Sequence, residues 1–153
     1  MLKITFVCLG NICRSPMAEL IFKNMLEKQG LSDKFDITSS ATSNYEIGNP
    51  IYYLAQQTLS KHNIKGRHTA KRISKQELAS SDFILVMDSE NYQDIMRING
   101  VDKNKVFKLC DFTSNPRDVA DPWYTRDFET TYNDILDGCT SFLEYLKSNN
   151  FLK

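Results

Sequence analysis

The chain has 153 residues, and its 19 lysines and arginines balance 19 aspartates and glutamates, so the formal net charge is zero. This length suits a single domain with a hydrophobic core, and a zero net charge excludes a general attraction to nucleic acid or anionic membranes. No apolar run approaches the ~20 residues of a membrane span, and residues 1–8 lack the apolar region of a signal peptide. We expect a cytoplasmic monomer that forms one domain over residues 1–153 and binds neither nucleic acid nor membranes.

Strand-like and helix-like segments alternate along the chain. Strands are expected at residues 3–8, 35–39, 83–87 and 105–109. Helices are expected from residue 16 to about Gly30 and at residues 52–62, 75–79, 89–97 and 128–147. The third strand, FILVM, is a continuous apolar run of the kind that is buried on both faces. Strands separated by helices of this length predict a parallel sheet that is covered by helices on both faces.

The segment VCLGNICRSP, at residues 7–16, joins the first strand to the first helix. In open α/β sheets, ligands bind beyond the carboxyl ends of the strands, often at this loop. Gly10 allows a tight turn, the loop N–H groups can form an anion-binding nest, and Arg14 offers a planar fork to two phosphate oxygens. Ser15 is expected to cap the helix and Pro16 to occupy its first position. The loop is therefore predicted to bind a tetrahedral dianion next to the positive end of the helix dipole.

Cys8 lies at the base of this loop. An environment that binds phosphate also stabilises a thiolate, which indicates a nucleophilic cysteine and phosphoryl transfer through a thiophosphate intermediate. A buried cysteine at a strand end is more often a small apolar residue, but the spacing C-x5-R-S followed by proline favours the nucleophile. The loop lacks G-x-x-x-x-G-K-[ST] and G-x-G-x-x-G, the signatures of nucleotide and dinucleotide sites. For Cys13, a structural role and a chemical role both stay open.

The other two cysteines, Cys110 and Cys139, stand far apart in the sequence. Cytoplasmic cysteines are normally reduced, so a disulfide framework is not expected. The four cysteines also lack the paired C-x2-C spacing of a structural zinc site. The sequence therefore predicts neither a metal centre nor another cofactor.

A phosphatase also needs a proton donor for the leaving group. The candidate is Asp121, in the segment ADPWYTRDF after the fourth expected strand. Trp123 and Tyr124 follow it and are suited to flank a flat substrate group. The alternative interpretation is an aspartate in a turn with two surface aromatic residues beside it.

These motifs together resemble the low-molecular-weight protein tyrosine phosphatase family. VCLGNICRSPMAE resembles its signature loop, ATSNYEIGNP the segment after the second strand, FILVMDSEN the third strand and its exit, and DPWY the acid loop. The order and spacing agree over nearly the whole chain. The resemblance implies a flavodoxin-like α/β fold, a single domain whose open parallel four-stranded sheet carries helices on both faces. It also implies hydrolysis of phosphotyrosine in proteins through a cysteinyl-phosphate intermediate.

The resemblance assigns roles to the motif residues. Cys8 is expected to be the nucleophile, Arg14 the phosphate clamp, and Asp121 first the general acid and then the general base. Ser15 is expected to hydrogen-bond the Cys8 thiolate and help it to leave. The full phosphate-binding loop would comprise Leu9, Gly10, Asn11, Ile12, Cys13 and Ser15.

The resemblance also implies roles for residues around the loop. Asn11 would hold the strained shape of the loop, with Ser39 and His68 bracing it. Cys13 matches a second loop cysteine that forms a reversible disulfide with Cys8 under oxidation. The walls and rim of the substrate cleft would consist of Tyr45, Glu46, Trp123 and Tyr124.

The chain departs from the family pattern in three places. It has IYYLA after the GNP turn, where the family often has an aspartate and an arginine, and this affects the rim contacts. The segment TRD after DPWY is shorter than in many members and lacks their glycines. Ile12 replaces a threonine found in the phosphoarginine-specific branch, which favours phosphotyrosine.

Two further functions are compatible with such a loop. Arsenate reductases share the fold but need a closely spaced pair of further cysteines, which Cys110 and Cys139 do not form. A non-catalytic phosphotyrosine-binding module would have lost the nucleophile or the acid, whereas Cys8, Arg14 and Asp121 are all present. The enzyme is the preferred interpretation.

Overall fold

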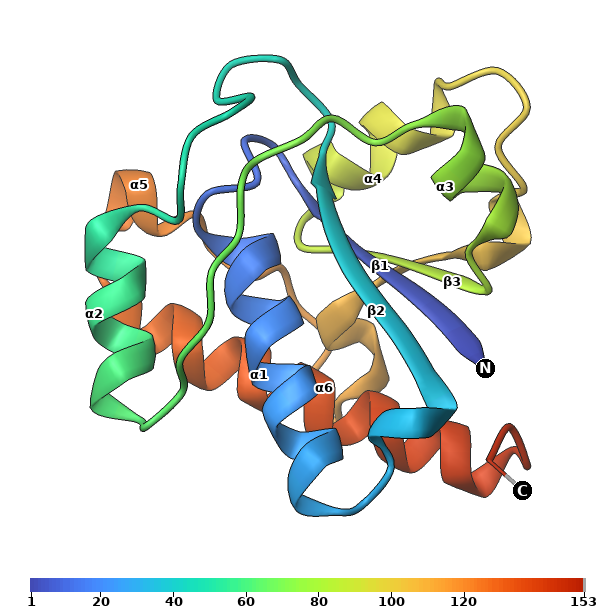
Figure 1. Ribbon diagram of the computed structural model, residues 1–153. Helices are drawn as coiled ribbons and strands as arrows, with labels where there is room; N and C mark the ends of the chain where they lie inside the picture. The colour runs from blue at the N-terminus through green and yellow to red at the C-terminus, as the bar shows by residue number, and fades with distance from the viewer. Residues whose placement is uncertain (153) are drawn as a thin grey trace.

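Four parallel strands form one sheet in the order β2-β1-β3-β4 (Figure 1). The computed structural model describes residues 1–152, and its strands are β1 (Leu2–Cys8), β2 (Phe35–Ala41), β3 (Phe83–Val86) and β4 (Val106–Lys108). β1 lies inside the sheet between β2 and β3, so the chain turns to opposite edges of the sheet on either side of it. Ligands of open α/β sheets bind at such a point. The parallel four-stranded sheet expected from the sequence is confirmed.

Helices cover both faces of the sheet, as expected. On one side lie α1 (Arg14–Lys28), α2 (Tyr53–Lys61) and α6 (Phe128–Ser148), and on the other lie α3 (Lys75–Ser80) and α4 (Ser89–Met96) (Figure 1). The remaining helical elements are short: α5 (Pro122–Thr125) and the 3₁₀ turns η1 (Ser32–Lys34), η2 (Lys103–Lys105) and η3 (Leu109–Phe112). Loops at the carboxyl ends of the strands connect these layers and carry the candidate site.

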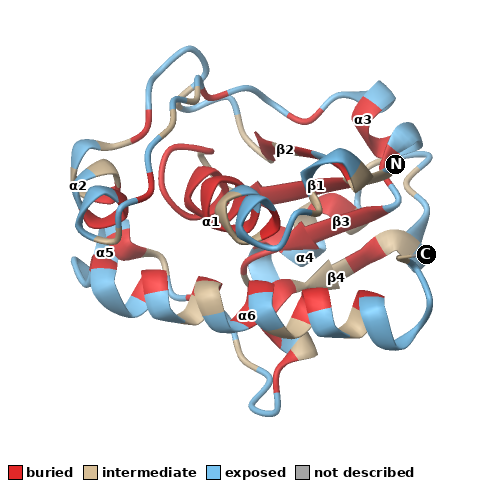
Figure 2. Ribbon diagram, turned by 60° about the horizontal axis from the view of Figure 1, so that its bottom comes forward, coloured by how far each residue is buried: buried red, intermediate tan, exposed pale blue. Residues whose placement is uncertain are grey.

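The hydrophobic core lies on both faces of β1, because successive side chains of a strand point in opposite directions. Phe6 packs into the larger cluster, edge-on against Phe22 of α1 with ring centroids 5.8 Å apart. Val7 belongs to the smaller cluster with Leu78 of α3 and Ile95 of α4. Figure 2 shows β3 and most of β1 and β2 buried, β4 partly buried, and the outer surface of α6 exposed. β1 is therefore a rigid base for the loop that follows it.

β1 and β3 differ in length from the sequence expectation by one residue, and β2 and β4 differ by two. β2 extends to Ala41 because this residue still pairs with Cys8 of β1 and is flanked by Arg72 on its other side. β4 has three residues only, because the chain turns into η3 at Leu109. The longer β2 places its end directly beside the loop that begins at Cys8.

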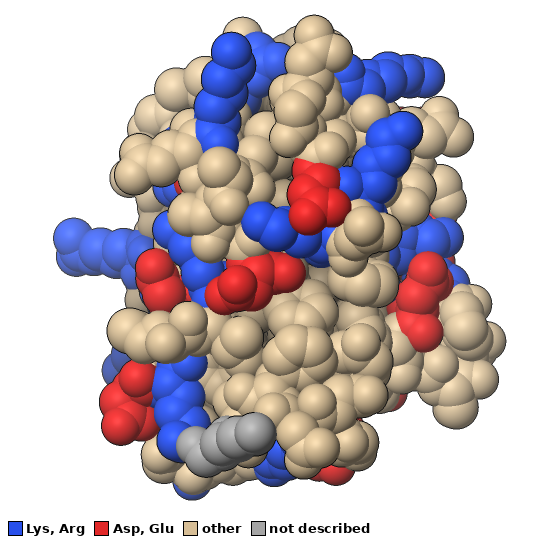
Figure 3. Space-filling model, turned by 90° about the vertical axis from the view of Figure 1, so that its right-hand side faces the viewer, with Lys and Arg blue, Asp and Glu red and all other residues tan. Residues whose placement is uncertain are grey.

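The surface carries charges of both signs. On the face that holds α3 and the chain termini, Lys and Arg side chains stand among Asp and Glu side chains (Figure 3). Several of these side chains are paired, including Lys3 with Asp36 and Lys71 with Glu77. None of the helices within residues 1–152 is long and apolar enough to span a membrane.

Candidate active site

The loop between β1 and α1 wraps around the sulfur of Cys8. The backbone N–H groups of Asn11 and Ser15 point at Cys8 Sγ, with N···S distances of 3.3 and 3.4 Å, and Ser15 Oγ lies 3.0 Å from it. Cys8 is only 3% exposed. Donors that converge on a sulfur stabilise a negative charge on it, so this loop can hold a thiolate.

Ser15 does not cap helix α1, so that prediction is wrong. The helix begins two residues earlier than expected, at Arg14, and its N-cap residue Cys13 makes no side-chain capping bond. Ser15 stands in the first turn, where its hydroxyl contacts Cys8 Sγ and accepts a hydrogen bond from Asn11 Nδ2 at 2.7 Å. Pro16 is consequently the third helical residue. The early start places the Ser15 N–H in the first turn, where it has no intrahelical partner and donates to the sulfur.

Asn11 fixes the shape of the loop. Its backbone has a φ of 60°, in the left-handed region that few residues other than glycine adopt, although asparagine is among the more tolerant. The side chain is buried and fully engaged: Nδ2 also donates to Ser39 Oγ at 3.1 Å, while Oδ1 accepts from His68 Nε2 at 2.6 Å and from Lys71 N at 3.1 Å. The structure thus brings Ser39 and His68 to Asn11.

Glu19 contacts both residues that brace Asn11, a role that its sequence context does not predict. It lies on α1 one turn after Ser15, is 6% exposed, and accepts from Ser39 Oγ at 2.7 Å. Its Oε1 also lies 3.5 Å from His68 Nδ1. Burial lowers the pKa of His68, although the charge of Glu19 opposes this. Because the Asn11 amide oxygen only accepts, His68 Nε2 carries the proton in that contact.

Arg14 is 3% exposed and is held by three acceptors. Nη1 donates to Asp88 Oδ2 at 2.6 Å and to the Val119 carbonyl at 2.9 Å, and Nη2 lies 3.4 Å from Asp121 Oδ2. Burial opposes the charge on Arg14, but Cys8 and the two carboxylates outweigh it and raise the guanidinium pKa. Arg14 is therefore a fixed cation. Asp88 lies in the segment FILVMDSEN, and no local pattern of that segment predicts its contact with Arg14.

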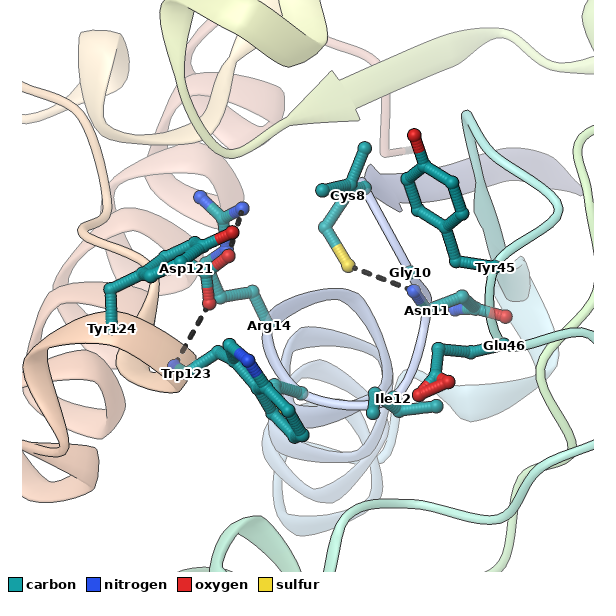
Figure 4. Close-up of a pocket in the computed structure, with 12 residues that line it drawn as sticks. Cys8, Gly10, Asn11, Ile12, Arg14, Tyr45, Glu46, Asp121, Trp123 and Tyr124 are labelled. Carbon is teal, nitrogen blue, oxygen red and sulfur yellow. Dashed lines mark hydrogen bonds and ion pairs between the residues drawn. The ribbon is translucent and has the colours of Figure 1, made fainter.

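Asp121 lines a cavity together with Cys8 and Arg14. It caps the short helix α5, where Oδ1 accepts from Trp123 N at 3.0 Å. The cavity has a volume of about 260 Å³. In Figure 4, Cys8 Sγ points into it between Asp121 on one side and Tyr45 and Glu46 on the other. All loop and cleft residues predicted from the sequence line this cavity except Ser15, which lies behind it with Ser39 and His68.

The rim of the cavity is aromatic. Tyr45, Trp123 and Tyr124 line it with side chains that are 79%, 45% and 77% exposed. Glu46 packs over Gly10 so closely that a Cβ at that glycine would lie 3.3 Å from Glu46 Cγ. A flat ring can therefore enter between aromatic walls and present an attached phosphate to the loop.

Comparison with known proteins shows to which family the chain belongs. The family model for low molecular weight phosphotyrosine protein phosphatase matches residues 3–151. The chain belongs to this family.

Relatives and solved structures agree with this membership. The low molecular weight phosphotyrosine protein phosphatase of Rattus norvegicus is 41% identical over 147 residues, covering 92% of this chain and 93% of the relative. The crystal structure of YfkJ from Bacillus subtilis matches with a TM-score of 0.92 at 36% identity, covering 97% and 96% of the two chains. DARP, a drosophila arginine phosphatase, matches with a TM-score of 0.88 at 29% identity, covering 95% and 98%.

The second cysteine of this low molecular weight phosphatase has a different environment from the first. Cys13 is 5% exposed, and burial, followed by the nearby Cys8 and Asp121, raises the pKa of its thiol to about 12. It is therefore a neutral thiol at physiological pH. Burial likewise raises the pKa of Cys110 to about 11. Residues 1–152 contain no cluster of three or more side chains suited to hold a metal ion.

The phosphatase loop also has outside anchors that the sequence analysis did not name. The carbonyl of Leu9 accepts from Ser43 N at 3.2 Å and from Ser43 Oγ at 2.7 Å. The carbonyl of Ile12 accepts from Tyr52 N at 2.9 Å. Both donors lie in the segment after β2. The quoted motif ATSNYEIGNP contained Ser43, whereas Tyr52 lies in the departure IYYLA, whose contacts no local pattern predicts.

Proposed function

We propose that this protein is a phosphoric monoester hydrolase that removes phosphate from phosphotyrosine in proteins through a cysteinyl-phosphate intermediate. The observation that carries the proposal is the loop N–H groups and the Ser15 hydroxyl gathered on Cys8 Sγ. Arg14 and Asp121 face the same cavity. A nucleophile, an anion clamp and a proton donor are the groups that such a reaction needs.

In the first step, the phosphate binds to the loop N–H groups and to Arg14. The Cys8 thiolate attacks phosphorus, the S–P bond forms, and the P–O bond to the tyrosine breaks. Asp121 gives its proton to the departing phenolic oxygen.

In the second step, the Asp121 carboxylate acts as a general base. Asp121 takes a proton from a water molecule, whose oxygen attacks phosphorus as the P–S bond breaks. The bonding electrons return to Cys8 as a thiolate, which the Ser15 hydroxyl, 3.0 Å away, stabilises by donating to it. Inorganic phosphate then leaves, and Asp121 is protonated again for the next cycle.

The cavity wall supports an aromatic substrate. Ile12 lines it as an apolar residue, and Tyr45, Trp123 and Tyr124 surround the entrance. Phosphoarginine is the competing substrate, because DARP is an arginine phosphatase. A guanidinium group gains little from an apolar wall at Ile12, whereas a phenyl ring is stabilised by burial against it. We therefore expect phosphotyrosine peptides to be hydrolysed in preference to phosphoarginine peptides.

The deciding experiment is a rapid-mixing assay with p-nitrophenyl phosphate. The wild-type protein should release a burst of nitrophenol equal to the amount of enzyme, as an accumulating phosphoenzyme requires. Cys8→Ser should bind vanadate-type phosphate analogues but lose turnover by several orders of magnitude. If Cys8→Ser kept a tenth of wild-type activity, the covalent mechanism would be wrong. A protein that binds but never turns over would be a binding module, and arsenate-dependent thiol oxidation without phosphate release would indicate a reductase.

We also propose that residues 1–153 act as one phosphatase domain, as a cytoplasmic monomer without a nucleic-acid or membrane partner and under redox control through Cys8 and Cys13. The free thiols and the mixed surface charges support this setting. Sedimentation analysis of the purified protein tests the monomer, and a dimer at micromolar concentration would overturn it.

A further inference from the structure

A cluster of one arginine and three aromatic rings, here called the clasp, lies beside the active-site rim. It consists of Arg126, Tyr52, Trp123 and Phe128. The Arg126 guanidinium carbon lies 5.5 Å from the ring centroid of Tyr52, 5.9 Å from that of Trp123 and 5.7 Å from that of Phe128. Its Nη2 also donates a hydrogen bond to Tyr52 Oη at 3.0 Å. Cations over aromatic faces are attracted by the ring quadrupole, so these groups hold one another.

Tyr52 connects the clasp to the phosphate-binding loop. Its backbone N–H donates to the carbonyl of Ile12 at 2.9 Å. Its ring meets Trp123 edge-on, with centroids 4.9 Å apart, and stacks on Phe128 at 5.9 Å. Tyr52 therefore contacts the phosphate-binding loop through its backbone. Through its side chain it contacts the acid segment, residues 121–126, which carries the proton donor.

Arg126 ends the acid segment in a strained conformation. It is the C-cap of α5 with a φ of 61° and ψ of 14°, a left-handed geometry in which glycine is usual. Its N–H closes the helix on the Pro122 carbonyl at 2.9 Å, and Nη1 reaches the Trp123 carbonyl at 3.4 Å. An arginine at this position is explained by what its guanidinium contacts rather than by its backbone preference.

The clasp continues to the proton donor. Trp123 N donates to Asp121 Oδ1 at 3.0 Å, so the segment that contacts Tyr52 and Arg126 also orients the carboxyl. α5 has only four residues, and a single helical turn is not stable by itself. Its position must therefore come from tertiary contacts.

We propose that Tyr52 and Arg126 are positioning residues for proton transfer, which hold α5 so that Asp121 reaches the leaving oxygen. This inference rests on the proposed function. It joins two segments that lie far apart in the sequence, IYYLA and the segment that follows Asp121, as halves of one contact.

The first test uses Tyr52→Phe, which removes one hydroxyl and keeps the ring, and Arg126→Gly, which keeps the left-handed backbone and removes the guanidinium. The matched control is Tyr53→Phe, because the Tyr53 hydroxyl makes no hydrogen bond among residues 1–152 and the ring is 60% exposed. The burst rate constant is measured for a series of aryl phosphates whose phenols differ in acidity. Both test variants should slow the most basic leaving groups by roughly tenfold to a hundredfold, the cost of a small misplacement, and the most acidic ones by about twofold or less.

The second test combines each variant with Asp121→Asn. Once the proton donor is absent, its position no longer matters, so Tyr52→Phe should add no further loss to the Asp121→Asn protein. The clasp proposal is refuted if Tyr52→Phe and Arg126→Gly slow all leaving groups equally, if their losses multiply with that of Asp121→Asn, or if they match the Tyr53→Phe control. A wild-type protein that does not turn over p-nitrophenyl phosphate would instead refute the proposed function itself, and the positioning role with it.

Discussion

Replacing Asp121 with asparagine should change catalysis and phosphate binding in opposite directions. Asparagine retains an oxygen that accepts from Trp123 N, at 3.0 Å in the native protein, and it is as good a helix cap as aspartate. The short helix α5 should therefore stay in place. The substitution removes two things only: the proton donor, and a negative charge that lies 3.4 Å from Arg14 Nη2.

The two losses have different sizes. General acid catalysis contributes roughly 10²–10⁴-fold, so the burst rate for phosphotyrosine should fall by that factor. The fall should be smaller for p-nitrophenyl phosphate, whose leaving group needs the proton less. The ion pair joins a buried Arg14 to an Asp121 side chain that is 22% exposed, and such partly solvated pairs contribute about 1 kcal/mol or less. Releasing Arg14 from it should strengthen competitive inhibition by phosphate up to about fivefold.

Stopped-flow bursts with both substrates and phosphate inhibition constants measure these effects, and an unchanged melting temperature is the control for folding. Equal slowing of both leaving groups would show that Asp121 is not the acid. Two other carboxyls lie near Asp121 in the sequence, and both have different partners. Asp118 pairs with Lys108 at 3.0 Å, and Asp127 accepts from Thr130 N at 3.0 Å. Weaker phosphate inhibition would contradict the assigned Arg14 contact.

Two further predictions concern redox and pH. Because Cys13 is a neutral thiol with a pKa of about 12, peroxide should oxidise Cys8 to the sulfenic acid, which Cys13 then traps as a disulfide with loss of water. Activity should return with dithiothreitol in the wild type but not in Cys13→Ser, and equal recovery would exclude a protective role. Burial opposes ionisation of Glu77, but hydrogen bonds from Lys71 and Ser40 outweigh it and hold its pKa below 4.5. Its contribution to stability is therefore present above that pH and lost as the pH falls through the lowered pKa. Denaturant unfolding should show the advantage of wild type over Glu77→Gln shrinking from about pH 6 to about pH 3, and a constant difference would contradict this.

The sequence was most informative where local chemistry decides the structure. Apolar runs such as residues 83–87 predict buried strands because little else tolerates them. The spacing of Cys8 and Arg14 predicts a loop at a strand-to-helix junction, and the structure places that loop around the sulfur. Contacts between residues that are distant in sequence could not be predicted in this way. Asp88 and Arg14 are 74 residues apart, and so are Tyr52 and Arg126.

Ser15 shows a second limit. Serine before proline is a typical helix start, and the helix instead begins at Arg14. The serine hydroxyl has two possible partners: a backbone N–H of its own helix, from which it would accept, or the Cys8 sulfur. Which of them it contacts depends on where β1 places Cys8, and that is fixed by the whole sheet rather than by the local sequence.

The bracing of Asn11 has a consequence for how the protein is made. Its side-chain oxygen accepts from His68 and Lys71, which follow it by 57 and 60 residues. The proton donor at Asp121 follows later still, shortly before α6 completes the core. Contacts between distant residues form late because loop closure must precede them. A nascent chain emerging from the ribosome would therefore carry Cys8 for most of its synthesis without the bracing or the acid, and we expect phosphatase activity to arise only when the C-terminal helix has docked.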